Sequence, residues 1–413
     1  MIKYYQFNVY YYFRVKKEVV TIHKGEVLLV RGPASARPFQ GKVFCLAKDF
    51  KELIIRKGKA LPIETFEESA SIILLLYEDA TYEIRRGDLG YTIWAEEIEK
   101  CKSKLGNEYK KVMVIGPTDS GKSTLTVLLS NISISMNKKV GILDGDVGQA
   151  DLTPPAFIGC KILKEGIFDL RDVHADFVIP VGLIDVSIDE ELIIKSMKKA
   201  IEYFKETDIV IINTDGYIEG AGVAYKIKLI KEMNPDALFL IGNEELKTRF
   251  SSLNCDIINL KIPPAIGKDR ATRALRREMQ YAKFISTNSR INIDLKTVGF
   301  GFLGRIFKNL KYELGSISLE SEDGYKMRIF SSREFSIVIN EAFKTVYIPI
   351  EVLEGMLVGL EKDRNIVGYG LIEKIVDLKA RIATSSKPIL DMIWLTLIRF
   401  VNNSEQKIKL LRI

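Results

Sequence analysis

A glycine-rich loop between an apolar run and a helical pattern is the feature that most constrains this fold. Residues 116–124 read Gly-Pro-Thr-Asp-Ser-Gly-Lys-Ser-Thr, after the apolar residues 111–115 and before the helical pattern of residues 125–134. The spacing matches G-x-x-x-x-G-K-[ST], in which backbone amides at a helix N-terminus surround phosphate oxygens. The loop therefore predicts a nucleoside triphosphate site in a P-loop fold.

Each residue type in the loop has a reason to be there. Gly116 and Gly121 let the backbone approach phosphate oxygens closely. Lys122 is expected to reach the β- and γ-phosphates, and the Ser123 hydroxyl is expected to bind Mg²⁺. The expected nucleotide-binding residues are Gly116, Pro117, Thr118, Asp119, Ser120, Gly121, Lys122, Ser123 and Thr124.

Composition narrows the class of protein. A chain of 413 residues predicts two or three domains, and 47% hydrophobic with 28% charged residues is typical of a globular protein. The net charge of +7 permits a basic groove for nucleic acid without requiring one. Four cysteines without C-x-x-C spacing and only two histidines argue against a zinc site or a Ser-His-Asp triad. Without a signal peptide or an apolar run of about 18 residues, we expect a cytoplasmic protein and no membrane partner.

The order of apolar runs predicts an α/β fold with a central P-loop NTPase domain and a parallel sheet, flanked by small β-rich domains. Residues 1–100 contain short strand-like runs between glycine turns, and residues 288–413 return to that pattern, with separate strands expected at residues 366–372 and 374–377. Residues 101–287 alternate short apolar strands with helical patterns, as parallel sheets covered on both faces do. Asp144, Asn213 and the P-loop each lie at the carboxyl end of such a strand, so we expect them near one crevice. Residues 407–413 are expected to form a terminal strand.

A second acidic motif closes the apolar run that follows the P-loop helix. The run ends at Asp144, and the chain continues Gly-Asp-Val-Gly-Gln. A carboxylate at a strand end beside a P-loop holds Mg²⁺ or its waters, so Asp144 and Asp146 are expected at the metal with Ser123. One of the two can also accept a proton from an attacking hydroxyl. On a continuing strand they would point the same way, whereas a turn at Gly145 would separate them, and a solvated acidic turn is the alternative.

Residues 116–124 together with 144–149 resemble the polynucleotide 5′-hydroxyl kinase family that includes Clp1 and Grc3, and most closely its compact archaeal members. The resemblance covers residues 108–285 best. It implies that ATP is the phosphate donor, that the aspartate of Asp-x-Gly-Gln, here Asp146, activates the 5′-hydroxyl of RNA or DNA, and that Lys122 acts with it in catalysis.

The same resemblance implies a substrate clasp and a lid. The family's aromatic residue after the next strand is tryptophan, and here residues 213–217 read Asn-Thr-Asp-Gly-Tyr. Tyr217 can still stack on a base, although a buried tyrosine at a sheet end is the alternative. Arg270, Arg273 and Arg277 recur at helical spacing in a segment similar to the family's arginine-rich lid, with a solvated basic face as the alternative. The expected catalytic arginines are Arg273 and Arg276, and the expected substrate-binding residues are Gln149, Tyr217, Arg270 and Arg277.

These features predict an ATP-dependent kinase that phosphorylates the 5′-hydroxyl end of RNA or DNA. One alternative is a P-loop ATPase that uses hydrolysis as a conformational switch. Another is an RNA-processing scaffold that keeps ATP bound. Labelling of a 5′-hydroxyl oligonucleotide distinguishes the kinase from both.

Overall fold

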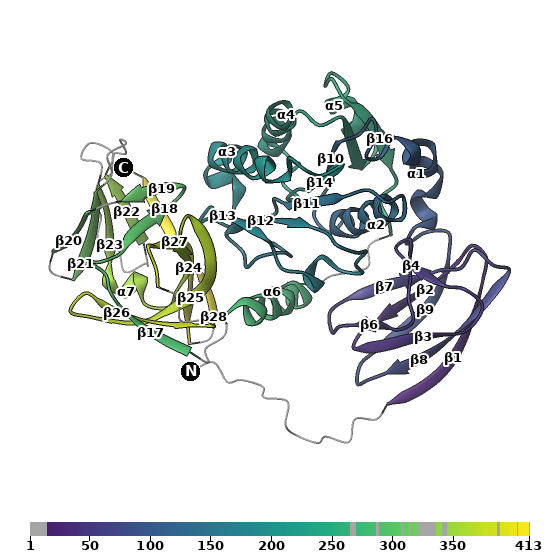
Figure 1. Cartoon of the computed structure of the whole chain (residues 1–413), viewed down its shortest axis with the longest axis horizontal. Helices are drawn as coiled ribbons and strands as arrows, with labels where there is room; N and C mark the ends of the chain where they lie inside the picture. Colours follow the sequence, from purple (N-terminus) through teal and green to yellow (C-terminus); the bar gives the residue numbers. More distant parts are fainter. Residues whose placement is uncertain are drawn as a thin grey trace.

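Two β-rich regions flank an α/β unit in the computed structural model (Figure 1). The arrangement confirms the predicted fold class. The structure describes residues 15–264, 270–285, 289–307, 309–313, 315–320, 336–340, 345–385, 389–402 and 404–412. Among these residues, no helix is long and apolar enough to cross a bilayer.

The central sheet has seven strands in the order β13-β12-β11-β14-β10-β15-β16. Its five parallel members are β10 (Lys111–Ile115), β11 (Val140–Asp144), β14 (Ile209–Asn213), β15 (Ala237–Ile241) and β16 (Asp256–Leu260). The sheet continues through two antiparallel strands that we did not predict, β12 (Phe157–Ile162) and β13 (Phe177–Pro180). They extend the sheet beyond β11. The strand that ends at Asp144 is therefore an interior strand and not the outermost one.

Helices cover both faces of this sheet. The helices here are α1 (Ala95–Cys101), α2 (Lys122–Ser135), α3 (Glu190–Ile201), α4 (Ala221–Met233) and α5 (Glu244–Phe250), whereas α6 (Arg270–Phe284) packs against the C-terminal region. Apolar side chains of α2 join a core shared with the N-terminal region, and those of α3 and α4 join a core shared with the C-terminal region. On β11, Ile142 belongs to the first core and Leu143 to the second, because successive strand residues point to opposite faces. The continuous apolar runs follow from this two-sided burial.

The N-terminal region consists of short antiparallel strands. One sheet has the order β1-β8-β3-β6 and another the order β7-β2-β9. Their bounds are β1 (Lys16–His23), β2 (Glu26–Arg31), β3 (Ala34–Gln40), β4 (Phe44–Cys45), β5 (Lys48–Asp49), β6 (Leu53–Ile55), β7 (Ala60–Ile63), β8 (Ser69–Leu76) and β9 (Thr81–Arg86). The loop between β6 and β7 reaches the central unit and carries Lys59, which matters for the site.

The C-terminal region holds a sheet of order β17-β26-β25-β24-β27-β18-β19, with β28 paired to β27, and a sheet of order β20-β21-β23-β22-β29. The bounds are β17 (Ser289–Asp294), β18 (Gly299–Phe302), β19 (Arg305–Phe307), β20 (Asn309–Glu313), β21 (Ser316–Glu320), β22 (Ser336–Asn340), β23 (Thr345–Pro349), α7 (Ile350–Leu353), β24 (Met356–Lys362), β25 (Asn365–Val376), β26 (Lys379–Thr384), β27 (Met392–Val401), β28 (Ser404–Lys407) and β29 (Lys409–Arg412).

The end of the chain differs from the single terminal strand predicted for residues 407–413. Lys407 closes β28, and β29 begins at Lys409 in the other sheet. Ile408 between them is buried, so the chain crosses the core of the region as it changes sheet. Ile413 lies outside the described residues.

Candidate active site

The glycine-rich loop connects β10 to α2 in a conformation that needs both of its glycines. Gly121 has a φ of +97°, a left-handed conformation that side chains disfavour. A Cβ at Gly116 would lie 2.6 Å from the Ser120 Oγ and 2.9 Å from the Ile241 carbonyl oxygen. The loop is therefore packed tightly between β10 and the end of β15.

Lys122 opens α2 and is buried against the loop. Its Nζ donates a hydrogen bond to the Pro117 carbonyl at 2.7 Å, and the residue is only 7% exposed. Burial lowers the pKa of Lys122 to about 8, with the charge of Lys226 acting in the same direction. A phosphate group in the cleft would oppose both effects, since it favours the ammonium form.

Asp144, at the end of β11, is fully buried and points away from the P-loop cleft toward the following turn. Its carboxylate accepts hydrogen bonds from the Asp151 amide at 2.7 Å, the Leu152 amide at 3.2 Å and the Asn213 Nδ2 at 2.9 Å. The bond from Asn213 confirms that the ends of β11 and β14 meet. Burial, followed by the neighbouring Asp151, raises the pKa of Asp144 to about 7.

Asp146 lies beyond the strand and takes a different direction from Asp144. Its Oδ1 accepts hydrogen bonds from the Gly148 amide at 3.2 Å and the Gln149 amide at 2.9 Å. The side chain is half-buried and lines the cleft. Burial, followed by the charge of Asp215, raises its pKa. The turn at Gly145 therefore separates the two carboxylates, and of the two only Asp146 lines the cleft.

A buried ion pair supports the segment that carries Tyr217. Lys226, on α4, approaches Asp215 at 2.8 Å, with the lysine side chain 0% exposed and the aspartate side chain 8% exposed. The other carboxylate oxygen of Asp215 accepts from the Tyr217 amide at 2.8 Å. A Cβ at Gly216 would collide with Thr118, so this segment lies against the P-loop. Tyr217 itself is half-buried and lines the cleft.

These groups surround a cleft of about 460 Å³. Residues from all three regions line it: Lys59, Thr118, Asp119, Gly121, Lys122, Ser123, Thr124, Asp146, Gly148, Gln149, Ile184, Asp185, Val186, Asp215, Gly216, Tyr217, Arg277, Glu405 and Lys407. Gly116, Pro117, Ser120 and Asp144 are not among the lining residues and lie behind the surface of the cleft. The structure thus brings Lys122, Ser123, Asp146, Gln149, Tyr217 and Arg277 to one cleft.

A smaller hollow of about 110 Å³ adjoins the other side of the P-loop. Trp94 forms part of its wall, with its Nε1 donating to the Lys261 carbonyl at 2.9 Å. Apolar side chains of Leu29, Pro62 and Leu89 complete it on the N-terminal side. Lys59, Asp119, Gly121 and Thr124 line both this hollow and the cleft. The two spaces therefore meet at the P-loop, where a flat apolar group attached to phosphates would fit.

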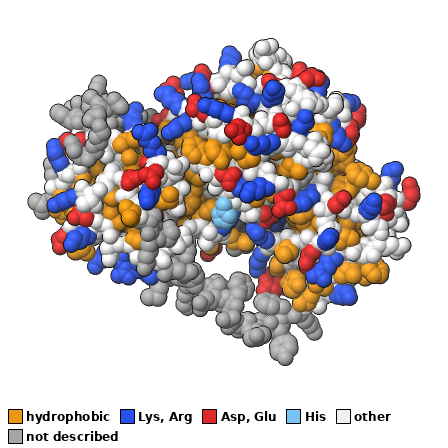
Figure 2. Space-filling model, in the orientation of Figure 1, with side chains coloured by type: hydrophobic (Ala, Val, Ile, Leu, Met, Phe, Trp, Pro, Cys, Tyr) orange, Lys and Arg blue, Asp and Glu red, His pale blue; other side chains and the backbone are white. Residues whose placement is uncertain are grey.

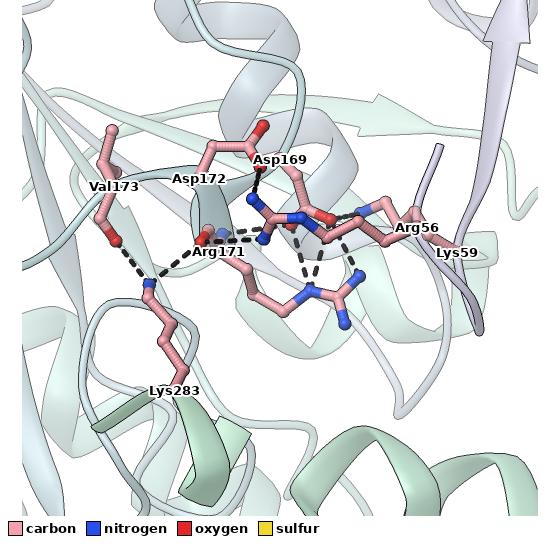
Figure 3. Close-up of polar contacts among 7 residues, drawn as sticks. All are labelled: Arg56, Lys59, Asp169, Arg171, Asp172, Val173 and Lys283. Atoms are coloured by element: carbon pink, nitrogen blue, oxygen red, sulfur yellow. Dashed lines mark hydrogen bonds and ion pairs between the residues drawn. The ribbon is translucent and has the colours of Figure 1, made fainter. Parts of the chain in front are cut away.

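Next to this hollow, a polar junction formed by Arg56, Lys59, Asp169, Arg171, Asp172 and Lys283 joins the N-terminal region, the turn at residues 169–173 and α6 (Figure 3). Asp169 accepts from Arg171 at 2.8 Å and from Lys59 at 3.1 Å. Arg56 pairs with Asp172 at 3.0 Å. Lys283, on α6, donates to the carbonyls of Arg171 and Val173 at 2.9 and 2.8 Å.

The helix expected as a lid is present as α6, which begins at Arg270. The side chains of Arg270, Arg273 and Arg276 lie outside the described residues. Arg277 is described, and its Nε pairs with Glu405 of β28 at 3.0 Å. Further along the helix, the side-chain Nε2 of Gln280 donates hydrogen bonds to the Asp151 and Thr153 carbonyls at 2.7 and 3.1 Å. α6 is thus held against the turn after β11, the C-terminal region and the polar junction.

Sequence reasoning missed several residues that line these spaces. Lys59, Trp94, Glu405 and Lys407 come from segments far from the P-loop in sequence, and no motif marks them. Lys226 did leave a signal. It precedes Leu229, Ile230 and Met233 at helical spacing, and all three are buried with it. A lysine on the apolar side of a helix predicts a buried carboxylate partner.

Comparisons with known proteins agree with this geometry. Residues 116–287 match the model of a family described as the mRNA cleavage and polyadenylation factor CLP1 P-loop. A polyribonucleotide 5′-hydroxyl-kinase of Pyrococcus horikoshii is 30% identical over 329 residues, covering 75% of this chain and 88% of that protein. The Pyrococcus furiosus kinase of the same name is 28% identical over 316 residues, covering 71% and 87%. A solved structure of a wild-type Clp1p–Pcf11p complex shares the fold, with a TM-score of 0.67 and 14% identity over 93% of this chain and 98% of that one.

Proposed function

The chain belongs to the family of the polyribonucleotide 5′-hydroxyl-kinases, and we propose that it transfers the γ-phosphate of ATP to the 5′-hydroxyl end of RNA. One observation carries this proposal. A single cleft is lined by the P-loop residues Lys122 and Ser123, by the half-buried carboxylate of Asp146 and by the ring of Tyr217. A phosphate donor site, a proton acceptor and a platform for a base are the parts that phosphoryl transfer to a nucleic acid end requires.

ATP would bind across the P-loop with its two ends in different surroundings. The amides of residues 121–124 and Lys122 would hold the phosphates. The hollow beside Trp94 would take the base, since it adjoins the loop and carries apolar walls. Lys59, which lines both spaces, would lie near the sugar and phosphates.

The residues present fit a magnesium ion of the kind that P-loop enzymes use. Mg²⁺ keeps several waters and takes few protein ligands beside phosphate oxygens. Ser123, half-buried in the cleft, would be the direct ligand, with Asp146 behind its waters. Asp144, which the sequence placed at the metal, is buried behind the surface of the cleft and would not face those waters. When bound, the ion would neutralise negative charge on the transferred phosphate.

Asp146 would act as the general base. The acceptor O5′ attacks the γ-phosphorus, the bond from that phosphorus to the β–γ bridging oxygen breaks, and the proton of the 5′-hydroxyl moves to the Asp146 carboxylate. A raised pKa suits this task, because a stronger base accepts a proton more readily. Gln149 and Tyr217 would orient the acceptor. Lys122 with Arg273 and Arg276 of α6 would stabilise the charge of the transition state.

The test is transfer of label from γ-labelled ATP to a short RNA with a 5′-hydroxyl end, beside the same RNA carrying a 5′-phosphate. We expect label only on the 5′-hydroxyl strand. Lys122→Ala should abolish transfer, because the lysine contacts the donor phosphates. A DNA strand of the same sequence, run in parallel, shows whether the acceptor site accepts both sugars.

Lys139→Ala is the matched control for Lys122→Ala. Lys139 is exposed, lies at the opposite end of the sheet and pairs with Glu206 at 3.3 Å. This variant should transfer label at the wild-type rate. Release of inorganic phosphate without labelled RNA in the wild type would contradict the kinase and favour a switch ATPase.

A further inference from the structure

The C-terminal region forms one wall of the cleft. The Leu397 amide of β27 donates to the Gly182 carbonyl at 2.6 Å, and the segment after Gly182 brings Ile184 and Val186 to the cleft. Packing continues along α6, where the Tyr281 and Phe400 rings meet edge to face with centroids 4.9 Å apart. β27 and its partner β28 are therefore fixed beside the site.

Two side chains of β28 reach the cleft from this wall. Glu405 and Lys407 are two residues apart on a strand, so they share one face, and both line the cleft. Their pairing differs. The Glu405 carboxylate accepts a hydrogen bond from the Arg277 Nε at 3.0 Å. By contrast, no carboxylate in the described part of the chain lies within ion-pair distance of Lys407. Lys407 is also exposed, so its charge is available to a ligand in the cleft.

The hollow beside Trp94 distinguishes two groups of residues that line the cleft. Lys59 lines both the cleft and the hollow beside Trp94, which marks the nucleotide end. Glu405 and Lys407 line the cleft but not that hollow. In phosphoryl transfer the attacking and leaving oxygens are roughly in line, so the acceptor approaches from the side away from the departing nucleotide.

Resting on the proposed function, we infer that Lys407 is a positioning residue for the acceptor strand and binds one of its backbone phosphates. The acceptor would run from Asp146 and Tyr217 along β28, with Lys407 setting its path. Figure 2 shows acidic and basic side chains interspersed over the surface it draws. The charged residues that line the cleft are likewise of both signs. A lysine without an ion-pair partner among the described residues therefore has more weight in guiding an anionic strand.

The experiment compares wild type, Lys407→Ala and Lys407→Arg with 5′-hydroxyl RNA acceptors of about ten nucleotides. We expect Lys407→Ala to raise the KM for RNA roughly threefold to tenfold and to leave kcat and the KM for ATP unchanged. The slope of log KM against log salt should fall by about 0.7, the share of one phosphate contact on a single strand. Lys407→Arg should restore the wild-type KM.

Two controls separate a phosphate contact from a structural effect. Lys379→Ala removes an exposed lysine of β26 that does not line the cleft, and it should behave as wild type. An acceptor with methylphosphonate linkages, which carry no charge, should show the same KM with wild type and Lys407→Ala.

Each other outcome is decisive. If wild type labels RNA and Lys407→Ala matches Lys379→Ala, the inference fails and the proposed function stands. A loss of kcat that Lys407→Arg does not restore would assign Lys407 a structural role and overturn the inference. Absence of label with wild type overturns the inference together with the proposed function.

Discussion

The strand-end site, formed by Asp144, Asp146 and Asp215 with Lys122 and Lys226, and the polar junction both bury charge. They differ in how it is compensated. Asp169 at the junction has two cations, Lys59 and Arg171, within 3.1 Å. Asp215 at the strand ends has Lys226 at 2.8 Å. Among described residues, Asp144 and Asp146 form no ion pair and rely on amide donors.

This difference in charge compensation indicates that the junction has a structural role and the strand-end site a catalytic one. The junction has four cations for two carboxylates, and its lysines and arginines also satisfy backbone carbonyls (Figure 3). Burial raises the pKa of Asp172 at the junction as well, but Arg56, Lys59 and Arg171 oppose that rise. At the strand-end site burial raises the pKa values of Asp144 and Asp146, which have no ion-pair partner among the described residues. A buried carboxylate with a raised pKa is stabilised when a cation or a proton binds to it. Carboxylates of this kind are concentrated at functional sites. The strand-end site is therefore where we expect chemistry, and the junction holds α6 in place beside it.

The largest expected effect on stability comes from removing Lys226, the one cation in ion-pair contact with Asp215 among the described residues. Lys226→Met should lower the free energy of unfolding by about 3–5 kcal/mol, because it leaves the buried Asp215 without its ion-pair partner. Denaturant unfolding measures it. Adding Asp215→Asn to Lys226→Met removes the uncompensated charge and should recover part of the loss. No recovery would mean that lost packing dominates the effect.

Arg171→Met at the junction should cost less, about 1.5–3 kcal/mol for lost hydrogen bonds to a charged group. Asp169 keeps Lys59 at 3.1 Å in this variant, so no carboxylate is left unpaired. The same unfolding measurement compares the two regions directly. A loss equal to that of Lys226→Met would show that the second cation at the junction gives no protection.

The Arg277–Glu405 pair, which joins α6 to β28 beside the cleft, tests a partly exposed ion pair. Its side chains are 34% and 19% exposed, so solvent reaches and partly screens this pair, and its contribution is expected to be small. Glu405→Gln should therefore change the free energy of unfolding by less than about 1 kcal/mol, and added salt should reduce the difference. A loss above about 2 kcal/mol would mean that this pair is a main anchor of α6.

The smallest effect is a pH dependence at Lys283. Burial, followed by the charge of Arg56, lowers the pKa of Lys283 from 10.5 to about 8. Between these values the unfolded chain binds more protons at this position, so the stability of wild type should rise with pH relative to Lys283→Met. The change is expected to stay under about 1 kcal/mol, because the side chain is only half-buried. Thermal unfolding at pH 7.5 and 10 measures it, and a fall with rising pH would contradict the assignment.

Local motifs made much of the strand-end site predictable. The glycine loop, the acidic motif and residues 213–217 each end a strand, and parallel strands bring their carboxyl ends to one edge. The hydrogen bond from the Asn213 Nδ2 to the Asp144 carboxylate confirms that these strand ends lie together. The sequence alone did not decide whether the Asp144 and Asp146 side chains point the same way, because that depends on how the chain turns at Gly145.

The junction and the outer wall of the cleft were not predictable in the same way. The hydrogen bond from Arg56 to Arg171 joins residues 115 positions apart, and such partners leave no local pattern. In the C-terminal region, residues 366–372 and 374–377 suggested two strands. They form one strand, β25, with a register shift between Ile372 and Lys374. An irregularity of this kind interrupts the alternation that marks a strand.

The most direct test of the strand-end site as the centre of catalysis is single-turnover transfer with Asp146→Asn. Asp189→Asn is its control, because Asp189 caps α3 outside the cleft through a bond from the Leu192 amide that asparagine can keep. We predict that Asp146→Asn binds ATP and 5′-hydroxyl RNA as wild type does and transfers phosphate about 10²–10⁴ times more slowly, while Asp189→Asn transfers at the wild-type rate. A wild-type transfer rate in Asp146→Asn would contradict its role as the base and the account of this site.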